Sequence, residues 1–135
     1  MDSKLKGYLI KNKINYESFK HPATFRVEES RSHKKDIPGL HCKTLFLKDD
    51  KDNFYLVGMP AEKKLNSKHL RKELGIRKLR FATENELKEQ INLIPGSVSI
   101  FGMIYAKNKN VILIFDKEVW DICMQMVNED RTLVE

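Results

Sequence analysis

The chain has 135 residues, of which 41% are hydrophobic and 33% are charged, and its 25 lysines and arginines exceed its 19 acidic residues. This length and apolar content predict one domain over residues 1–135 and exclude global disorder. The longest apolar run, Val111 to Phe115, is far shorter than the roughly 20 residues that span a bilayer. We therefore expect a cytoplasmic protein without membrane association, whose net charge of +6 favours a polyanionic partner such as RNA.

Cysteines and histidines are not placed as metal ligands usually are. Cys42 and Cys123 have no neighbouring cysteine, so we expect two buried thiols rather than a metal or redox site. The four histidines, at positions 21, 33, 41 and 69, are likewise not at ligand spacing. No phosphate-binding glycine motif is present, which argues against an ATP or dinucleotide enzyme. The sequence predicts neither metal nor cofactor.

The N-terminal region alternates predicted helices with a short strand. Leu5, Tyr8 and Leu9 fall on one face of a helix that begins at Ser3 and ends near Asn12. Residues 16–20 favour a brief strand, which the following His-Pro pair ends. Residues 27–35 favour a second helix, which stops before the Pro-Gly turn at positions 38 and 39.

A hairpin is the clearest structural signal in the chain. Two β-prone runs, His41 to Lys48 and Asn53 to Met59, flank the polar segment 49–52. Apolar residues occupy both alternating faces of each run, as in interior strands that are covered on both sides. Helices are therefore expected to pack on both faces of the sheet.

The second half of the chain continues this alternation. Residues 67–74 predict a helix with Ser67 as its N-cap and Gly75 as its stop, and residues 79–82 a strand. Thr83 to Glu86 has the spacing of a capping box, which begins a helix ending near position 91. A loop over 94–99, an apolar strand over 111–115, the start of a helix near 119–123 and of a last strand at 132–134 follow. The fold class is α/β or α+β, with a mixed, mostly antiparallel central sheet and flanking helices.

Two features could carry chemistry. If residues 42–48 form a strand, Lys43 shares a face with Leu45 and Leu47, so its ammonium starts at the edge of a buried apolar surface. Lys43 is then either a strand-end lysine that extends into water or a cation in a lined pocket. The loop from Pro95 to Gly102 has the glycines, serines and backbone amides of a site that cradles an oxyanion, although a plain surface turn has the same composition. No arrangement of serine, cysteine and histidine suggests a covalent nucleophile.

Five segments together resemble a known family. They are residues 16–22, with a strand and a His-Pro turn, then 41–49, 54–57, 79–84 and the loop 95–102. In this order they resemble the YbaK/prolyl-tRNA synthetase-associated domains, and within them the free-standing prolyl-tRNA editing type. The resemblance covers roughly residues 5 to 118. The family's functional lysine falls on Lys43, and its substrate-pocket loop falls on 95–102.

The resemblance implies a trans-editing aminoacyl-tRNA deacylase that acts on mischarged tRNA for proline, with alanine as the characteristic wrong amino acid. It implies attack by water without a metal or a covalent enzyme intermediate. Lys43 and the backbone amide of Gly96 would act on the ester carbonyl. The substrate would also contact Thr44, His21, Ser97, Val98, Ser99, Ile100, Phe101 and Gly102. The implied partners are the acceptor end of an aminoacyl-tRNA and, secondarily, prolyl-tRNA synthetase.

The chain departs from the family pattern at two places. Ile100 stands where the pocket loop usually has proline. No histidine follows His69, whereas free-standing members carry a histidine-proline segment before their last strand; the matching region here is 126–132, and the C-terminal part is short or divergent. Two functions therefore stay open: a deacylase, or a non-catalytic tRNA-binding module or synthetase-associated homologue that has lost hydrolase activity.

Overall fold

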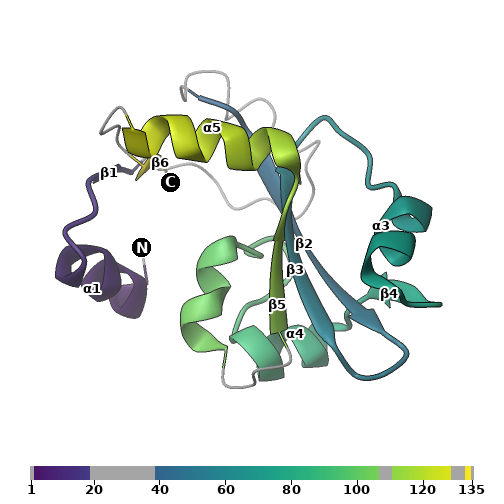
Figure 1. Cartoon of the computed structure of the whole chain (residues 1–135). Coiled ribbons are helices and arrows are strands. Elements are labelled where there is room, and N and C mark those ends of the chain that lie inside the picture. Colours follow the sequence, from purple (N-terminus) through teal and green to yellow (C-terminus); the bar gives the residue numbers. More distant parts are fainter. Residues whose placement is uncertain (1, 19–38, 107–110, 129–132, 135) are drawn as a thin grey trace.

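The computed structural model in Figure 1 describes residues 2–18, 39–106, 111–128 and 133–134. Its helices are α1 (Ser3–Lys11), α3 (Ser67–Leu74), α4 (Glu84–Ile91), the 3-10 helix η1 (Ile100–Tyr105) and α5 (Lys117–Asn128). Its strands are β1 (Tyr16–Glu17), β2 (Cys42–Asp49), β3 (Phe54–Pro60), β4 (Leu79–Phe81), β5 (Val111–Phe115) and β6 (Leu133–Val134).

The four longer strands form one mixed sheet in the order β4-β2-β3-β5. β2 pairs antiparallel with both β3 and β4, whereas β5 runs parallel to β3. The predicted hairpin and the mixed, mostly antiparallel sheet are thereby confirmed. The predicted last strand does not join this sheet, because β6 pairs with β1 in a separate two-stranded unit.

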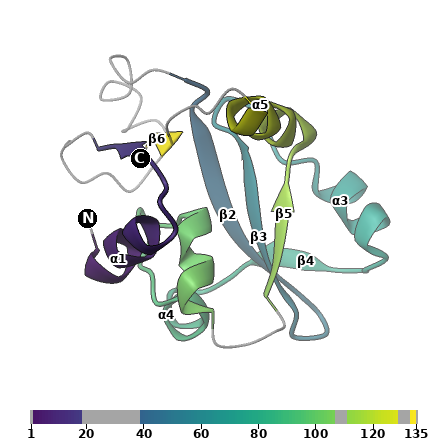
Figure 2. The same cartoon turned by 60° about the vertical axis from the view of Figure 1, so that its left-hand side comes forward.

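Helices cover both faces of the sheet, as Figures 1 and 2 show. On one face, α4 and η1 pack over a core that includes Phe46, Leu56 and Ile91. On the other, α3 lies over Leu47, Tyr55 and Val57. Every residue of β3 is buried, which fits an interior strand covered on each side. α5 crosses the end of the sheet at which β2 begins and β5 ends.

Local capping signals explain where two of the helices begin and end. The Thr83 backbone N–H donates to the Glu86 carboxylate at 2.9 Å, and the Glu86 N–H donates to the Thr83 hydroxyl at 3.2 Å, which confirms the capping box of α4. Gly75 ends α3 with a left-handed φ of 66°. The prediction of Ser67 as the N-cap of α3 was wrong by one residue, because Asn66 Oδ1 accepts the His69 N–H at 3.0 Å.

The helix predicted over residues 27–35 lies outside the described residues. Cys42 was expected to be buried and is exposed, because it is the first residue of β2, at the end of the sheet. Among the described residues, no helix is long and apolar enough to cross a membrane.

Candidate functional site

The loop that precedes η1 is built around a tight turn. The Ser97 N–H donates to the Ile94 carbonyl at 3.0 Å, with Pro95 and Gly96 as the two central residues. Gly96 has a φ of 87°, which makes this a type II turn, and that turn needs a positive φ at its third position. The Pro-Gly pair therefore fixes how the chain enters the loop.

The start of η1 fixes how the chain leaves the loop. The Ser99 hydroxyl accepts the Phe101 N–H at 3.2 Å, and the Ser99 carbonyl accepts the Gly102 N–H at 2.9 Å. Gly102 is buried against the end of α4, where a Cβ would lie only 2.9 Å from Leu93 Cδ1 and 3.1 Å from Ile91 Cδ1. Gly102 is thus required for close packing, and Val98 packs on the same core.

Several amides of this loop have no acceptor among the residues that the structure describes. Within the described part of the chain, the N–H groups of Gly96, Val98 and Ser99 donate to no other residue. Ser97 is exposed, while Ser99 and Phe101 are half-buried. Unpaired backbone donors beside a partly buried surface are the groups that can bind a carbonyl oxygen or an oxyanion.

Ile100 brings the loop to the sheet. A Cβ on Gly58 would lie 3.4 Å from Ile100 Cγ2 and 3.2 Å from Phe115 Cδ1, so the absence of a side chain at Gly58 lets both residues approach β3. Gly58 is the register partner of Thr44. Because directly paired residues of antiparallel strands share a face, Thr44 projects on the side of the sheet that carries the loop.

Lys43 starts from the opposite face. Its register partner is Met59, and it alternates with Thr44, so its Cβ lies on the face of Leu45, Leu47 and α3. Lys43 is half-buried and is the second residue of β2, at the end of the sheet. Among the described residues, its ammonium has no ion pair or hydrogen bond. The structure therefore brings the loop and Thr44 to one face and Lys43 to the other, at the same end of β2; His21 lies outside the described residues.

An ion pair near this end of the sheet ties separate segments together. Lys63 Nζ lies 2.8 Å from Asp116 Oδ2, and the same carboxylate accepts the Glu118 N–H at 3.0 Å. The hydrogen bond to Lys63 lowers the pKa of Asp116, and the partner raises the pKa of Lys63. The Asp116 N–H also donates to the Gly58 carbonyl at 2.8 Å. The chain after β3 is thus fixed to the end of β5.

Gly58 and Phe115 are the residues of this region that the sequence interpretation missed. A glycine inside an otherwise apolar strand was the available signal, because it often marks a close approach by another segment. No cluster of three or more histidine, cysteine, aspartate or glutamate side chains that could hold a metal occurs in the described residues.

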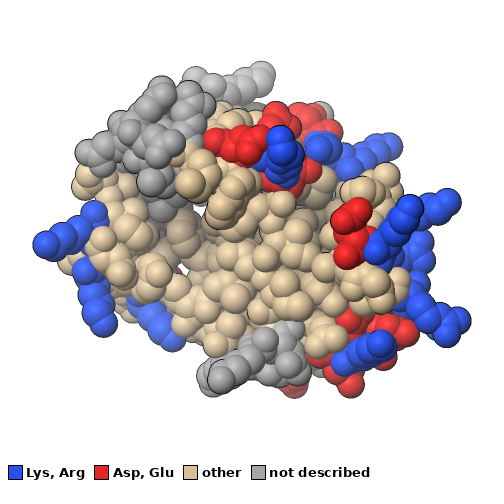
Figure 3. Space-filling view, viewed as in Figure 1, with Lys and Arg blue, Asp and Glu red and all other residues tan. Residues whose placement is uncertain are grey.

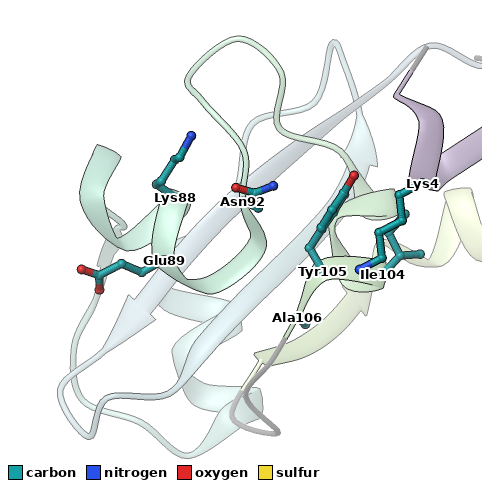
Figure 4. A pocket seen from close by; sticks show the side chains of 7 residues that line it. All are labelled: Lys4, Lys88, Glu89, Asn92, Ile104, Tyr105 and Ala106. Carbon is teal, nitrogen blue, oxygen red and sulfur yellow. The ribbon is translucent and has the colours of Figure 1, made fainter.

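A separate cavity of about 370 Å³ lies between α1, α4 and η1. Figure 4 shows Lys4 and Tyr105 on one of its sides and Lys88 and Glu89 on another. Lys4 Nζ is 4.4 Å from the centre of the Tyr105 ring. The described residues that line it include none of the predicted site residues, so this cavity is distinct from the candidate site.

Residues 21–133 match the family model of the aminoacyl-tRNA editing domain. The chain belongs to this family. The matched range contains Lys43, Thr44 and the whole loop 95–102, so the start of β2 and this loop are parts of an editing domain.

Three relatives show how the editing domain compares with known proteins. This chain is 36% identical over 110 residues to the "Prolyl-tRNA editing protein ProX" of Acetoanaerobium sticklandii, and the aligned part covers 79% of this chain and 66% of that protein. It is 30% identical to the "Prolyl-tRNA synthetase associated domain-containing protein 1" of Danio rerio, covering 85% of this chain and 62% of that one. The putative human protein of the same name is 38% identical, over 62% of this chain and 51% of its own length. The chain thus spans less than two thirds of the length of each.

A solved structure supports the fold. The crystal structure of hypothetical protein APE2540 matches with a TM-score of 0.72 and covers 98% of each chain, at 16% sequence identity. At that identity the likeness establishes the fold alone. The resemblance inferred from the five sequence segments and the mixed fold are both confirmed.

Proposed function

We propose that this editing domain hydrolyses the ester bond of mischarged tRNA for proline, with alanine as the amino acid removed. The observation that carries the proposal is the family match over residues 21–133, together with the relative named as a prolyl-tRNA editing protein. The loop 95–102 adds a chemical reason, because its amides that have no acceptor among the described residues are suited to a carbonyl whose oxygen becomes negatively charged.

The proposed reaction needs no group beyond this chain, water and the substrate. A water oxygen bonds to the ester carbonyl carbon, and the resulting oxyanion accepts hydrogen bonds from amides of the loop, including that of Gly96. The carbon–oxygen bond to the terminal ribose then breaks, the departing ribose oxygen takes up a proton that came from the attacking water, and the amino acid leaves with a carboxyl group. The role proposed for Lys43 is to add positive charge and a hydrogen bond at the same carbonyl.

The half-buried side chain of Ile100 gives the proposal a basis for selectivity. Ile100 packs against the strand at Gly58, whose register partner is Thr44. A site narrowed in this way would accept a methyl side chain more readily than the ring of proline. Discrimination by pocket size alone is worth only about 10- to 200-fold for each methylene group, so we expect a preference rather than absolute rejection.

The decisive experiment compares ester loss with the spontaneous rate. The purified chain is mixed in turn with alanyl-, cysteinyl-, seryl- and prolyl-tRNA for proline, and the remaining ester is followed over time. Faster loss of the alanyl ester than of the prolyl ester supports the proposal. Loss at the blank rate for all four esters would contradict it.

The second candidate, a non-catalytic tRNA-binding module, is favoured by two sequence observations. Ile100 replaces the usual loop proline, and no histidine follows His69. A binding module would retain uncharged tRNA with a salt-dependent affinity while leaving every ester intact. The four-ester assay, combined with a binding measurement, separates the two functions.

A further inference from the structure

The positive charge of this chain is concentrated in one segment. Residues 62–80 contain eight lysines and arginines but only two acids, a surplus of six, and the net charge of the whole chain is also +6. The other residues are therefore balanced between the two signs. Such a concentration creates a local potential that a uniformly basic surface lacks.

This segment is attached to the end of the sheet that holds Lys43. It leaves β3 at Pro60, one residue after Met59, the register partner of Lys43. α3 then packs Leu70 and Leu74 against the face that also carries Leu45 and Leu47. Lys43 and the basic segment thus lie on the same side of the sheet.

The apolar packing of α3 turns its lysines outward. Lys68 and Lys72 are four residues apart, so they project from one side of the helix about 6 Å apart along its axis. Both are exposed, as is Lys64 just before the helix. Figure 3 shows Lys and Arg side chains standing out at the right of the molecule, where α3 and β4 lie in Figure 1.

Three cations of the segment are already used within the protein. Lys63 pairs with Asp116, and Arg80 lies 2.8 Å from Glu86. Arg71 donates to the carbonyls of Ser67 and Arg77. The other five are exposed and form no ion pair within the described residues; they are Lys64, Lys68, Lys72, Arg77 and Lys78, which we call the α3 cation surface.

We propose that the α3 cation surface binds the phosphate backbone of the tRNA acceptor stem and thereby directs its aminoacylated end to the start of β2. The inference rests on the proposed function. Double-stranded RNA is bound largely through its phosphates and 2′-hydroxyls, which lysines contact without reading sequence. The surface therefore supplies affinity and orientation, while the loop 95–102 and Thr44 contact the aminoacyl group.

Charge-matched variants test the surface. The α3 variant carries Lys68→Gln, Lys72→Gln and Lys78→Gln. The control carries Lys6→Gln, Lys11→Gln and Lys88→Gln, which are also exposed but lie on α1 and α4, away from α3. Both variants lose three charges, and glutamine keeps the helix propensity of lysine. Thermal unfolding checks that each variant is folded.

Binding of uncharged tRNA is measured at several salt concentrations. Each lost phosphate contact lowers the slope of log affinity against log salt by up to about 0.9. The α3 variant should therefore lose about two to three units of slope and bind at least about tenfold more weakly at low salt. The control should stay within about twofold of the parent. Equal losses in both variants, or parent-like binding by the α3 variant, would overturn the inference.

The deacylation assay separates this inference from the proposed function. If the esters are hydrolysed, the α3 variant should raise KM and leave kcat near the parent value. If no ester is hydrolysed but tRNA affinity still depends on the α3 lysines, the proposed function fails and the surface stands. Binding of the parent to phosphatidylserine vesicles with no measurable tRNA binding would overturn the surface as an RNA site.

Discussion

The two ends of β2 differ in how many of their polar groups have a hydrogen-bond or ion-pair partner. At the hairpin end, the buried Asp49 carboxylate accepts the N–H groups of Lys51 at 2.8 Å and Asn53 at 3.0 Å. It also accepts the Asn53 side-chain amide at 3.1 Å and the Tyr55 hydroxyl at 2.8 Å. Burial alone would raise the pKa of Asp49, but the hydrogen bonds from Asn53, Tyr55 and Lys51 outweigh it and lower that pKa.

The neighbouring Glu86 is equally well paired. Its carboxylate lies 2.8 Å from Arg80 and 2.8 Å from Lys48, and it also accepts the Thr83 N–H. These partners, with Arg80 first, hold the pKa of Glu86 far below its usual range. At the hairpin end, the carboxylates of Asp49 and Glu86 are thus both satisfied within a closed network of hydrogen bonds and ion pairs.

The other end of β2 leaves hydrogen-bonding capacity unused. Lys43 has no ion pair among the described residues, and three amides of the loop 95–102 have no protein acceptor there. Polar groups in a partly buried region usually find partners, so groups left without them are available to a ligand. We therefore propose that the hairpin end maintains the fold and that a substrate binds at the other end, which we call the open end.

The largest expected effect is at the hairpin end. Asp49→Ala removes the acceptor of four donors, including the buried Tyr55 hydroxyl, and should lower the free energy of unfolding by about 3 kcal/mol or more. Urea denaturation measures the loss. Asp50→Ala, at the neighbouring exposed position, is the control and should change stability by less than about 0.5 kcal/mol. Similar stabilities for the two variants would show that the network does not support the fold.

The second effect is at the open end and should appear in the rate instead. Lys43→Ala should slow deacylation by about 10²-fold, equivalent to about 2.7 kcal/mol of transition-state stabilisation. Stability should be nearly unchanged, because alanine removes a half-buried cation that has no ion pair among the described residues. Lys51→Ala, in the exposed hairpin turn, serves as the control. A parent-like rate in the Lys43 variant would remove this lysine from the site.

The third prediction uses pH to test the hydrogen bond from the Tyr55 hydroxyl to the Asp49 carboxylate. Burial, and then the hydrogen bond to Asp49, raise the pKa of Tyr55 to about 12. A raised pKa in the folded state adds stability below the unfolded pKa of about 10, and this contribution disappears as pH rises to about 12. The advantage of the parent over Tyr55→Phe should therefore shrink by about 2 kcal/mol between about pH 10 and pH 12.

Comparing these two proteins cancels the alkaline titration of the other groups, and equilibrium denaturation at each pH supplies the free energies. Tyr8→Phe, at an exposed position, is the matched control. Its difference from the parent should stay constant with pH. A constant difference for Tyr55→Phe as well would mean that the Tyr55–Asp49 bond does not control the ionisation.

Local patterns were sufficient to predict much of the fold. The capping box at Thr83, the αL glycine at position 75 and the two-sided apolar strands each depend on residues close in sequence, and each was confirmed. The side-by-side placement of β5 and β3 was not predictable in this way, because it joins segments about fifty residues apart. The exposure of Ile112 and Leu113 follows from the edge position of β5, which composition does not reveal.

The candidate site was only partly predictable for the same reason. The alternation that put Lys43 on the face of Leu45 could be derived from sequence, but the face on which the loop lies depends on the tertiary fold. The contact of Ile100 with Gly58 decides it and places Thr44, rather than the Cβ of Lys43, on the side of the loop. The roles of Lys43 and Gly96 in catalysis remain predictions.

The smallest expected effect is at Gly96, in the turn at the open end of β2, and is judged against a glycine that lies within a helix. Gly96→Ala puts a Cβ on a residue with a φ of 87°, so it should cost about 1 kcal/mol of stability and shift the turn that orients the loop amides. Deacylation should then fall more than this small loss of stability explains, because displacing a preorganised donor acts directly on the transition state.

Gly7→Ala is the matched control. Gly7 lies within α1, where a Cβ would meet nothing within 4 Å, and alanine should stabilise this helix by about 0.5–1 kcal/mol. The same chemical change should therefore have opposite signs at the two glycines. If Gly96→Ala loses stability but keeps the parent rate at saturating substrate, the turn serves the fold alone, and the oxyanion donors must lie elsewhere in the loop.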